Sequence, residues 1–141
     1  MFEIKNEDTL FRLSFIERVE EPEEPQEDLI MCWLEINGCN ISLQCQCELT
    51  PYDLGSLKSR VSDFYHSLNR SEQPEPISFT PRMETFTCGF NLVEGSDRVG
   101  FTFTASPNVY DSWKLTDGIM IDQSYFPTLI RGIESILTNG Q

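Results

Sequence analysis

The side chains that could carry chemistry are one histidine, five cysteines and an excess of carboxylates. His66 follows Tyr65 inside an apolar pattern of helical spacing, and no partner motif accompanies it. No Ser/His/Asp or Cys/His catalytic arrangement can therefore be built from this chain. We expect His66 to be a solvated helix residue. A carboxylate pair such as Glu35 and Glu48 would support catalysis only if it converged on a pocket, so we predict that the protein is not an enzyme.

The cysteines do not form a metal-binding pattern. Cys45 and Cys47 would project to one side of a strand, about 6.6 Å apart along it, but no second Cys pair or His pair stands at zinc spacing. No Gly-rich phosphate loop is present either. An odd number of thiols inside apolar patterns indicates small core residues rather than a disulfide framework. These residues are Cys32, Cys39, Cys45, Cys47 and Cys88. We predict no metal and no cofactor.

Net charge is the strongest compositional signal. Ten Lys and Arg stand against 23 Asp and Glu, which gives a formal charge of −13. Such a field repels nucleic acid and anionic membranes, and it speeds encounter with basic proteins. No apolar run approaches the ~20 residues of a membrane span, and the N-terminus does not resemble a secretory signal. We expect a cytoplasmic protein with a basic protein partner, although solubility alone would also explain the charge.

Two amphipathic helices are expected. The first spans residues 50–69, where Thr50 can cap the helix and Asp53 can return the capping bond from the third position. The second begins at Ser124 and ends at Asn139-Gly140. Both carry apolar residues at helical spacing, so each should bury one face.

Alternating apolar residues predict strands over most of the remaining chain. A hairpin is expected over 29–49, with a two-residue turn at Asn37-Gly38. Its predicted pairs are Leu34 with Ile41, Cys32 with Leu43 and Ile30 with Cys45. A second hairpin is expected over 86–105, turning at 94–97. Further strands are expected over 2–5, 10–16 and 114–121.

These elements predict one domain, 1–141, of the α+β class, with two helices on one face of a mostly antiparallel sheet. The pseudo-halves 1–70 and 77–138 look alike, and a shift of 72 residues (126 − 54) superimposes them. The shift places Leu54, Leu57, Val61, Phe64 and Tyr65 on Phe126, Leu129, Ile133, Ile136 and Leu137. It also places Leu29 and Met31 on Phe101 and Phe103, and Cys47 and Leu49 on Ile119 and Ile121. Duplication is one explanation, and shared periodicity is the other.

Two surfaces are candidates for partner binding. The first is an acidic, Pro-broken loop over 17–28, which is either a solvated loop or a contact for a basic protein. Its candidate residues are Glu20, Glu21, Glu23, Glu24, Glu27 and Asp28. The second is the reverse face of the first hairpin, where an apolar stripe that includes an aromatic anchor is bordered by amides. Its candidate residues are Met31, Trp33, Gln44 and Gln46. A covering loop or strand over Trp33 is the alternative for this face.

Several stretches of the chain resemble WapI-type immunity proteins. They are Phe2-Glu3-Ile4-Lys5-Asn6, the acidic loop running into Trp33-Leu34, Leu49-Thr50 before the first helix, and the stretch from Ile77 to Phe86. The resemblance implies a cytoplasmic antidote to a polymorphic bacterial toxin, often a nuclease. It favours an immunity protein that binds and neutralises a basic toxin domain. The alternative is a small-ligand-binding or regulatory domain with a pocket between sheet and helices. The sequence predicts no oligomeric state.

Overall fold

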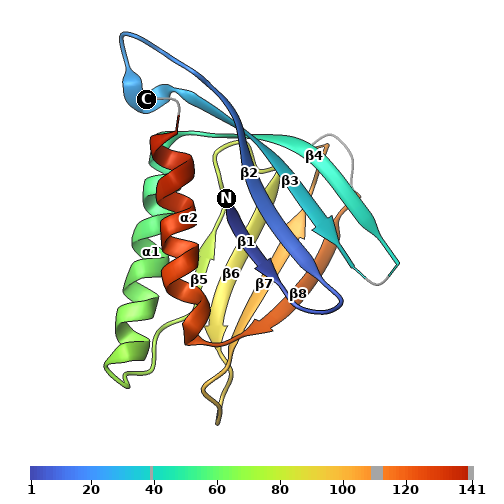
Figure 1. The fold of residues 1–141 in the computed structure, drawn as a ribbon, viewed down its shortest axis with the longest axis vertical. Coiled ribbons are helices and arrows are strands. Elements are labelled where there is room, and N and C mark those ends of the chain that lie inside the picture. The colour runs from blue at the N-terminus through green and yellow to red at the C-terminus, as the bar shows by residue number, and fades with distance from the viewer. Residues whose placement is uncertain (39, 109–112, 140–141) are drawn as a thin grey trace.

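The chain order is four strands and a helix, twice (Figure 1). The computed structural model describes residues 1–38, 40–108 and 113–139, so Cys39 and Gly140 lie outside the described residues. The first half contains β1 (Phe2–Lys5), β2 (Leu10–Val19), β3 (Leu29–Asn37), β4 (Ser42–Leu49) and α1 (Pro51–Asn69). The second contains β5 (Ile77–Phe79), β6 (Phe86–Leu92), β7 (Val99–Ala105), β8 (Leu115–Ile121) and α2 (Phe126–Thr138). Two short 3₁₀ turns, η1 (Pro25–Glu27) and η2 (Gln123–Tyr125), precede β3 and α2.

The strands form two antiparallel sheets. Sheet A has the order β1-β2-β3-β4 and sheet B the order β5-β6-β7-β8. The predicted α+β class, with antiparallel strands and two helices, is confirmed. The expectation of a single sheet is wrong. The strands before α1 pair only with one another, and so do the strands after it. Strand alternation indicates which side of a strand is buried but not which sheet the strand joins.

The core lies between the two sheets and is rich in phenylalanine. The ring of Phe11 in sheet A lies 5.1 Å from Phe101 and 5.0 Å from Phe103 in sheet B, centroid to centroid. Both helices lie together on one side of the molecule, where α2 contacts β1 and α1 contacts β5 (Figure 1). There Phe126 of α2 packs 5.5 Å from Phe90. The helix pair therefore closes one side of the sandwich.

The first helix begins as predicted. The Asp53 N–H donates to Thr50 Oγ1 at 3.1 Å, and the Thr50 N–H donates to Asp53 Oδ2 at 2.9 Å. This reciprocal pair satisfies two of the free amide groups at the helix start. His66 is exposed, as expected.

The 72-residue shift holds for the helices. The residues buried on their apolar faces are Leu54, Leu57, Val61 and Phe64 in α1 and Phe126, Leu129, Ile133 and Ile136 in α2. The shift also holds for Cys47 and Leu49, which are buried like Ile119 and Ile121. It is wrong for β3, because Met31 lies on the outer face while Phe103 is buried. Duplication remains a prediction.

The predicted hairpin over 86–105 is present, and its register places Phe90 opposite Phe101. The register predicted for the first hairpin is wrong. Leu34 lies opposite Cys45, and Asn37 lies opposite Ser42, so the turn is longer than two residues. The error is an even number of residues, which leaves the same side chains on the same face. Polarity alone could not distinguish the two registers.

A candidate protein-binding surface

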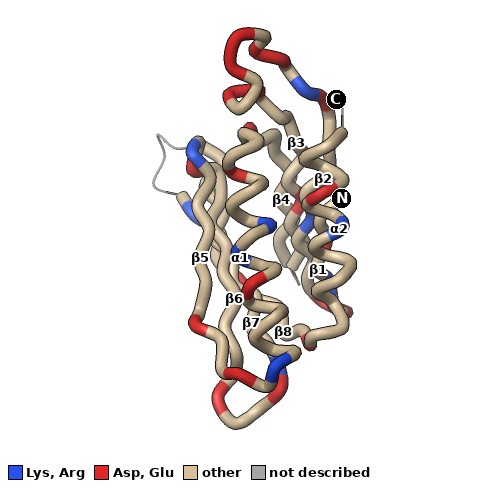
Figure 2. The backbone as a smooth tube through the Cα atoms, turned by 90° about the vertical axis from the view of Figure 1, so that its left-hand side faces the viewer, with Lys and Arg blue, Asp and Glu red and all other residues tan. Residues whose placement is uncertain are grey.

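The acidic loop projects from one end of the molecule. Residues 17–19 continue β2, so the loop is confirmed over 20–28, and the name refers to these residues below. Figure 2 shows the Asp and Glu positions of this loop, in red, gathered at this end of the backbone, well separated from the acidic turn between β6 and β7. All the loop glutamates are exposed: Glu20, Glu21, Glu23, Glu24 and Glu27. The loop therefore presents a concentrated negative charge to solvent.

A buried ion pair holds the base of the loop. Arg18 Nε donates to Asp28 Oδ2 at 2.8 Å, and the Glu21 N–H donates to Asp28 Oδ1 at 2.7 Å. The Glu21 amide, together with the Arg18 guanidinium, lowers the pKa of the Asp28 carboxyl below its ordinary value. Asp28 is only 5% exposed. The expectation that it is a flexible, solvated loop residue is wrong, because it serves as the internal acceptor for the loop.

A second contact ties the loop to the segment before β6. Arg82 Nη1 lies 2.5 Å from Glu27 Oε2, and the Arg82 N–H donates to Asp53 Oδ1 at 3.2 Å. Asp53 also takes part in the α1 cap, so Arg82 connects the loop to the start of this helix. The chain around 81–84 thereby lies beside the acidic loop. The sequence contained no signal for this contact, because it joins residues far apart in the chain.

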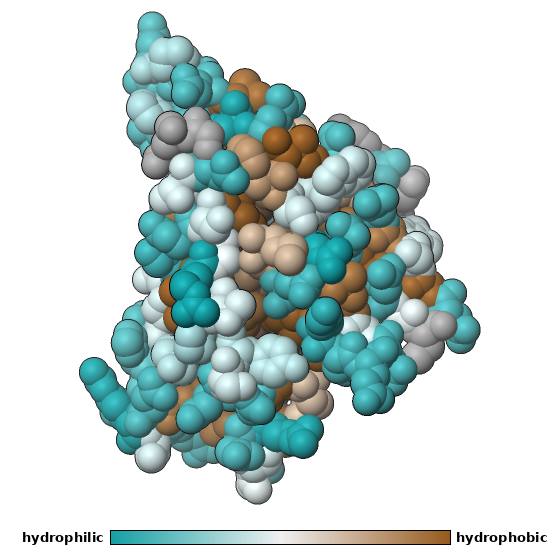
Figure 3. Space-filling view, viewed as in Figure 1, coloured by the Kyte–Doolittle hydropathy of each residue, from teal (hydrophilic) through white to brown (hydrophobic). Residues whose placement is uncertain are grey.

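The outer face of sheet A carries the second predicted surface. Trp33 is 36% exposed and lies directly opposite Gln46 on β4 and Ser14 on β2. Gln44 is also exposed on this face, while Met31 is half-buried. Figure 3 shows apolar patches set among hydrophilic residues over the side of the molecule formed by sheet A. The structure thus places Met31, Trp33, Gln44 and Gln46 on one face, as predicted.

A groove joins this face to the chain near the acidic loop. It has a volume of about 300 Å³ and is lined by Met31, Gln46, Glu48, Met83 and Pro107, among others. Met83 is 47% exposed and follows Arg82, which contacts the loop. Sequence reasoning missed Met83, which lies in a Pro-containing turn without periodicity. The groove therefore brings together one methionine from β3 and one from the segment before β6.

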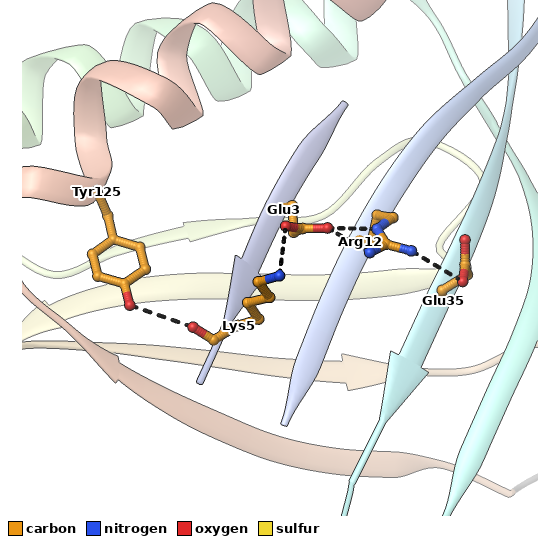
Figure 4. A network of polar contacts seen from close by, with 5 residues as sticks. All are labelled: Glu3, Lys5, Arg12, Glu35 and Tyr125. Atoms are coloured by element: carbon orange, nitrogen blue, oxygen red, sulfur yellow. Dashed lines mark hydrogen bonds and ion pairs between the residues drawn. The ribbon is translucent and has the colours of Figure 1, made fainter. Parts of the chain in front are cut away.

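The same face of sheet A contains a polar network (Figure 4). Arg12 Nη2 lies 2.6 Å from Glu3 Oε2, and Arg12 Nη1 lies 3.4 Å from Glu35 Oε2. The hydrogen bond and charge of Glu3, followed by those of Glu35, raise the pKa of Arg12. One guanidinium on β2 is thus shared by carboxylates on β1 and β3. The two carboxylates at this end of the outer face are therefore paired with a cation of the same chain, Arg12.

The residues considered for catalysis do not converge. Glu48 lies on β4 opposite Met31 of β3. Met31 is four residues along β3 from Glu35, so the two glutamates are separated by about 13 Å along the strand direction. No group of three or more metal-binding side chains is arranged around a common point in the part of the chain that the structure describes. The absence of catalysis and of a metal remains a prediction.

The described cysteines are free thiols in the interior or at its margin. Cys32 lies directly opposite Cys47, and burial raises the pKa of Cys32 to about 12. Burial likewise raises the pKa of Cys88 to about 12. Such thiols are protonated at neutral pH and poor nucleophiles or metal ligands. Their role is packing, as expected.

Near the predicted alternative site, a pocket between sheet and helices, the structure has an open surface hollow. A hollow of about 360 Å³ is lined by Glu3 and Lys5 of β1 and by Ser124, Tyr125 and Thr128 around the start of α2. Tyr125 Oη donates to the Lys5 carbonyl at 3.3 Å at its edge (Figure 4). Deeper between helices and sheets, Phe64 and Tyr65 stack on Phe126. Aromatic rings thus occupy the space where an internal pocket was considered.

Comparison with known proteins identifies similar folds only. No protein-family model matches the chain, and no curated protein sequence matches it. A solved structure of the plant transcriptional regulator PBF-2 is 10% identical, with a TM-score of 0.54 over 96% of this chain and 86% of that one. A structure of WHY1 from Arabidopsis thaliana is 11% identical, with a TM-score of 0.50 over 96% of this chain and 81% of the other. At these identities the likeness establishes the fold and nothing further.

Proposed function

We propose that this chain is a non-catalytic binding protein that captures and neutralises a basic protein, in the manner of an immunity protein acting on a toxin domain. The observation that carries the proposal is the acidic loop, anchored at Asp28 and Glu27, together with a groove whose lining includes Met31 and Met83. An exposed field of one sign accelerates encounter, and adjacent apolar surface retains the bound partner. Neither task requires a catalytic group.

The distribution of charge supports a basic partner. All ten Lys and Arg lie in the described residues, and five of them form ion pairs with carboxylates of the chain. These five are Lys5, Arg12, Arg18, Lys58 and Arg82. The glutamates of the acidic loop other than Glu27 have no such pair in the part of the chain described here. Their charge is available to a partner.

A role in transcription through direct contact with nucleic acid, which the fold likeness to a plant regulator raises, is less well supported. Such contact depends on Lys and Arg placed along the phosphates. This chain has a net charge of −13 and uses half of its cations internally. Binding of nucleic acid at physiological salt would contradict our proposal.

We also propose that the protein acts in the cytoplasm. The four described cysteines are free thiols, as is usual in a reducing compartment. In the described part of the chain, neither helix combines the length and apolar character required to cross a bilayer.

The experiment that tests the function uses the gene immediately upstream of the one that encodes this chain, where a toxin gene is expected. Its C-terminal domain is expressed alone and together with this chain, and growth is followed. Arrest by the domain alone, relief by co-expression and a 1:1 complex in calorimetry support the proposal. A harmless domain, or a toxic one that neither binds nor is relieved, contradicts it.

A further inference from the structure

The outer face of sheet A contains two similar rows of side chains, of which one lacks its cation. The first row runs Glu3, Arg12, Glu35 across β1, β2 and β3. Arg12 contacts both carboxylates, at 2.6 and 3.4 Å, with its side chain 28% exposed. The row shows that two glutamates separated by one strand on this face hold a single guanidinium.

The second row runs Glu17, Met31, Glu48 across β2, β3 and β4. Glu17 lies opposite Met31, and Met31 lies opposite Glu48. The two glutamates are again separated by one strand, about 10 Å between outer strands. Neither has an ion pair or hydrogen bond from a side chain within the described residues. Where the first row has a guanidinium, the second has only the thioether of Met31.

The irregularity of β2 produces this row. The register of β2 against β3 shifts between Phe15 and Glu17. Phe15 packs against the core, and without the shift the strict alternation of a strand would place Glu17 on that same buried side. The extra residue instead places Glu17 opposite the outward-facing Met31. The bulge therefore contributes the first carboxylate of the pair.

We propose that this row is a receptor for one arginine side chain of the basic partner, an inference that rests on the proposed function. The groove is lined by Met31, Met83 and Pro107, which offer apolar contact to the aliphatic stem, and also by Glu48. The guanidinium lies over Met31 and is shared by Glu17 and Glu48. Arginine fits better than lysine because its planar fork serves two carboxylates at once, as Arg12 does in the first row.

The receptor is tested with Nα-acetyl-L-arginine amide as the probe, in an NMR titration of protein labelled at the methionine methyl groups and at the backbone amides. We expect saturable binding in the millimolar range, as for one small cation on an open surface. The largest shifts should fall on the Met31 methyl and on the Glu17 and Glu48 amides. The lysine amide should bind more weakly, and the neutral citrulline amide should not bind. Equal shifts at carboxylates all over the surface would overturn the proposal.

Matched variants separate the row from general charge. Glu17→Gln with Glu48→Gln should weaken probe binding by about fivefold or more. Glu72→Gln with Glu94→Gln removes the same charge at exposed sites elsewhere and should change it by less than about twofold. An equal loss in both double variants would sink the proposal.

Met31→Arg gives an independent test that does not remove a carboxylate. It builds within the chain the arrangement that Arg12 makes in the first row, so the protein should fold with an unchanged or higher melting temperature. Probe binding should be lost because the site is already filled. A folded Met31→Arg variant that still binds the arginine amide at the row overturns the inference.

The two proposals fail in different ways. If the partner is captured normally by Glu17→Gln with Glu48→Gln, and that variant also binds the arginine amide normally, the receptor is wrong while the function stands. If the row binds arginine amide and no toxin domain is neutralised, the function is wrong while the site stands.

Discussion

Arg18 and Asp28 form an ion pair at 2.8 Å in which the side chains are only 5% and 6% exposed. Arg18 also donates from Nη1 to the backbone carbonyl of Leu137 at 2.8 Å. One guanidinium thus joins β2, the acidic loop and the last turn of α2. The loop that carries the largest exposed negative charge is held at its base by a contact that solvent barely reaches.

Asp28→Asn should destabilise the protein at neutral pH, because it leaves the Arg18 guanidinium buried without a counter-charge. The folded-state pKa of Asp28 is lowered, so its contribution is present above the ordinary Asp range and is lost as the pH falls through the lower folded value. Urea unfolding of both proteins should therefore give a constant difference down to about pH 5 that shrinks below about pH 4. The control is Glu24→Gln, because Glu24 is exposed and has no ion pair among the described residues. A difference independent of pH would contradict the role of the carboxylate.

Val61→Asp should lower the free energy of unfolding by about 4 kcal/mol or more, because Val61 is fully buried and a carboxylate there would have no partner. Ser59→Asp adds the same charge on the exposed side of α1 and should change stability by less than about 0.5 kcal/mol. Urea unfolding measures both. Similar effects of the two substitutions would mean that the buried face of α1 is misassigned.

Two helical glycines should respond to alanine in opposite directions. A Cβ at Gly132 of α2 would overlap the backbone carbonyl of Met1, so Gly132→Ala should destabilise by about 1–3 kcal/mol. A Cβ at Gly55 of α1 meets nothing within 4 Å, so Gly55→Ala should stabilise by up to about 1 kcal/mol through helix propensity. Thermal unfolding of the two variants tests the pair. Stabilisation by Gly132→Ala would show that α2 does not lie against the N-terminus.

Neutralising the acidic loop should slow capture of a basic partner. Replacing Glu20, Glu21, Glu23, Glu24 and Glu27 by Gln should lower the association rate about tenfold or more at low salt, with little change in dissociation. Physiological salt should erase much of the difference. Asp28 is kept because it supports the fold. Stopped-flow mixing with the toxin domain measures the rate.

The control for the loop variant removes five charges from exposed sites elsewhere on the chain. Its substitutions replace Asp63, Glu72, Glu75, Glu94 and Asp97 by the corresponding amides. Its association rate should fall less than that of the loop variant, because the field of a charge decays within about a Debye length. Equal slowing would assign the effect to net charge rather than to the loop.

Trp33→Ala should act on the opposite kinetic step. Loss of an aromatic anchor on the outer face of sheet A should raise the dissociation rate by about tenfold and leave association nearly unchanged. Met120→Ala removes an exposed apolar side chain from sheet B and is the matched control. Surface-based dissociation of the complex measures both. If Trp33→Ala changes only the melting temperature, the interface does not include this face.

Much of the local structure was predictable because it depends on neighbours in the chain. The cap of α1 by Thr50 and Asp53 is a contact over three residues, and the strands of the hairpin over 86–105 are joined by a short turn. Helical spacing also identified the buried face of each helix, which includes Val61 in α1 and Ile133 in α2. Likewise, alternation alone placed Trp33 and Gln46 on the outer face.

The tertiary structure decided what depends on contacts between distant segments. Alternation repeats every two residues, so it could not distinguish one register of the first hairpin from another, nor one sheet from two. The bulge before Glu17 shifted that residue to the outer face, and Arg82 brought Met83 beside the loop. Side-chain pairing across strands and across the chain has no local sequence period. The charge of the candidate surface was therefore set by composition, and its geometry by folding.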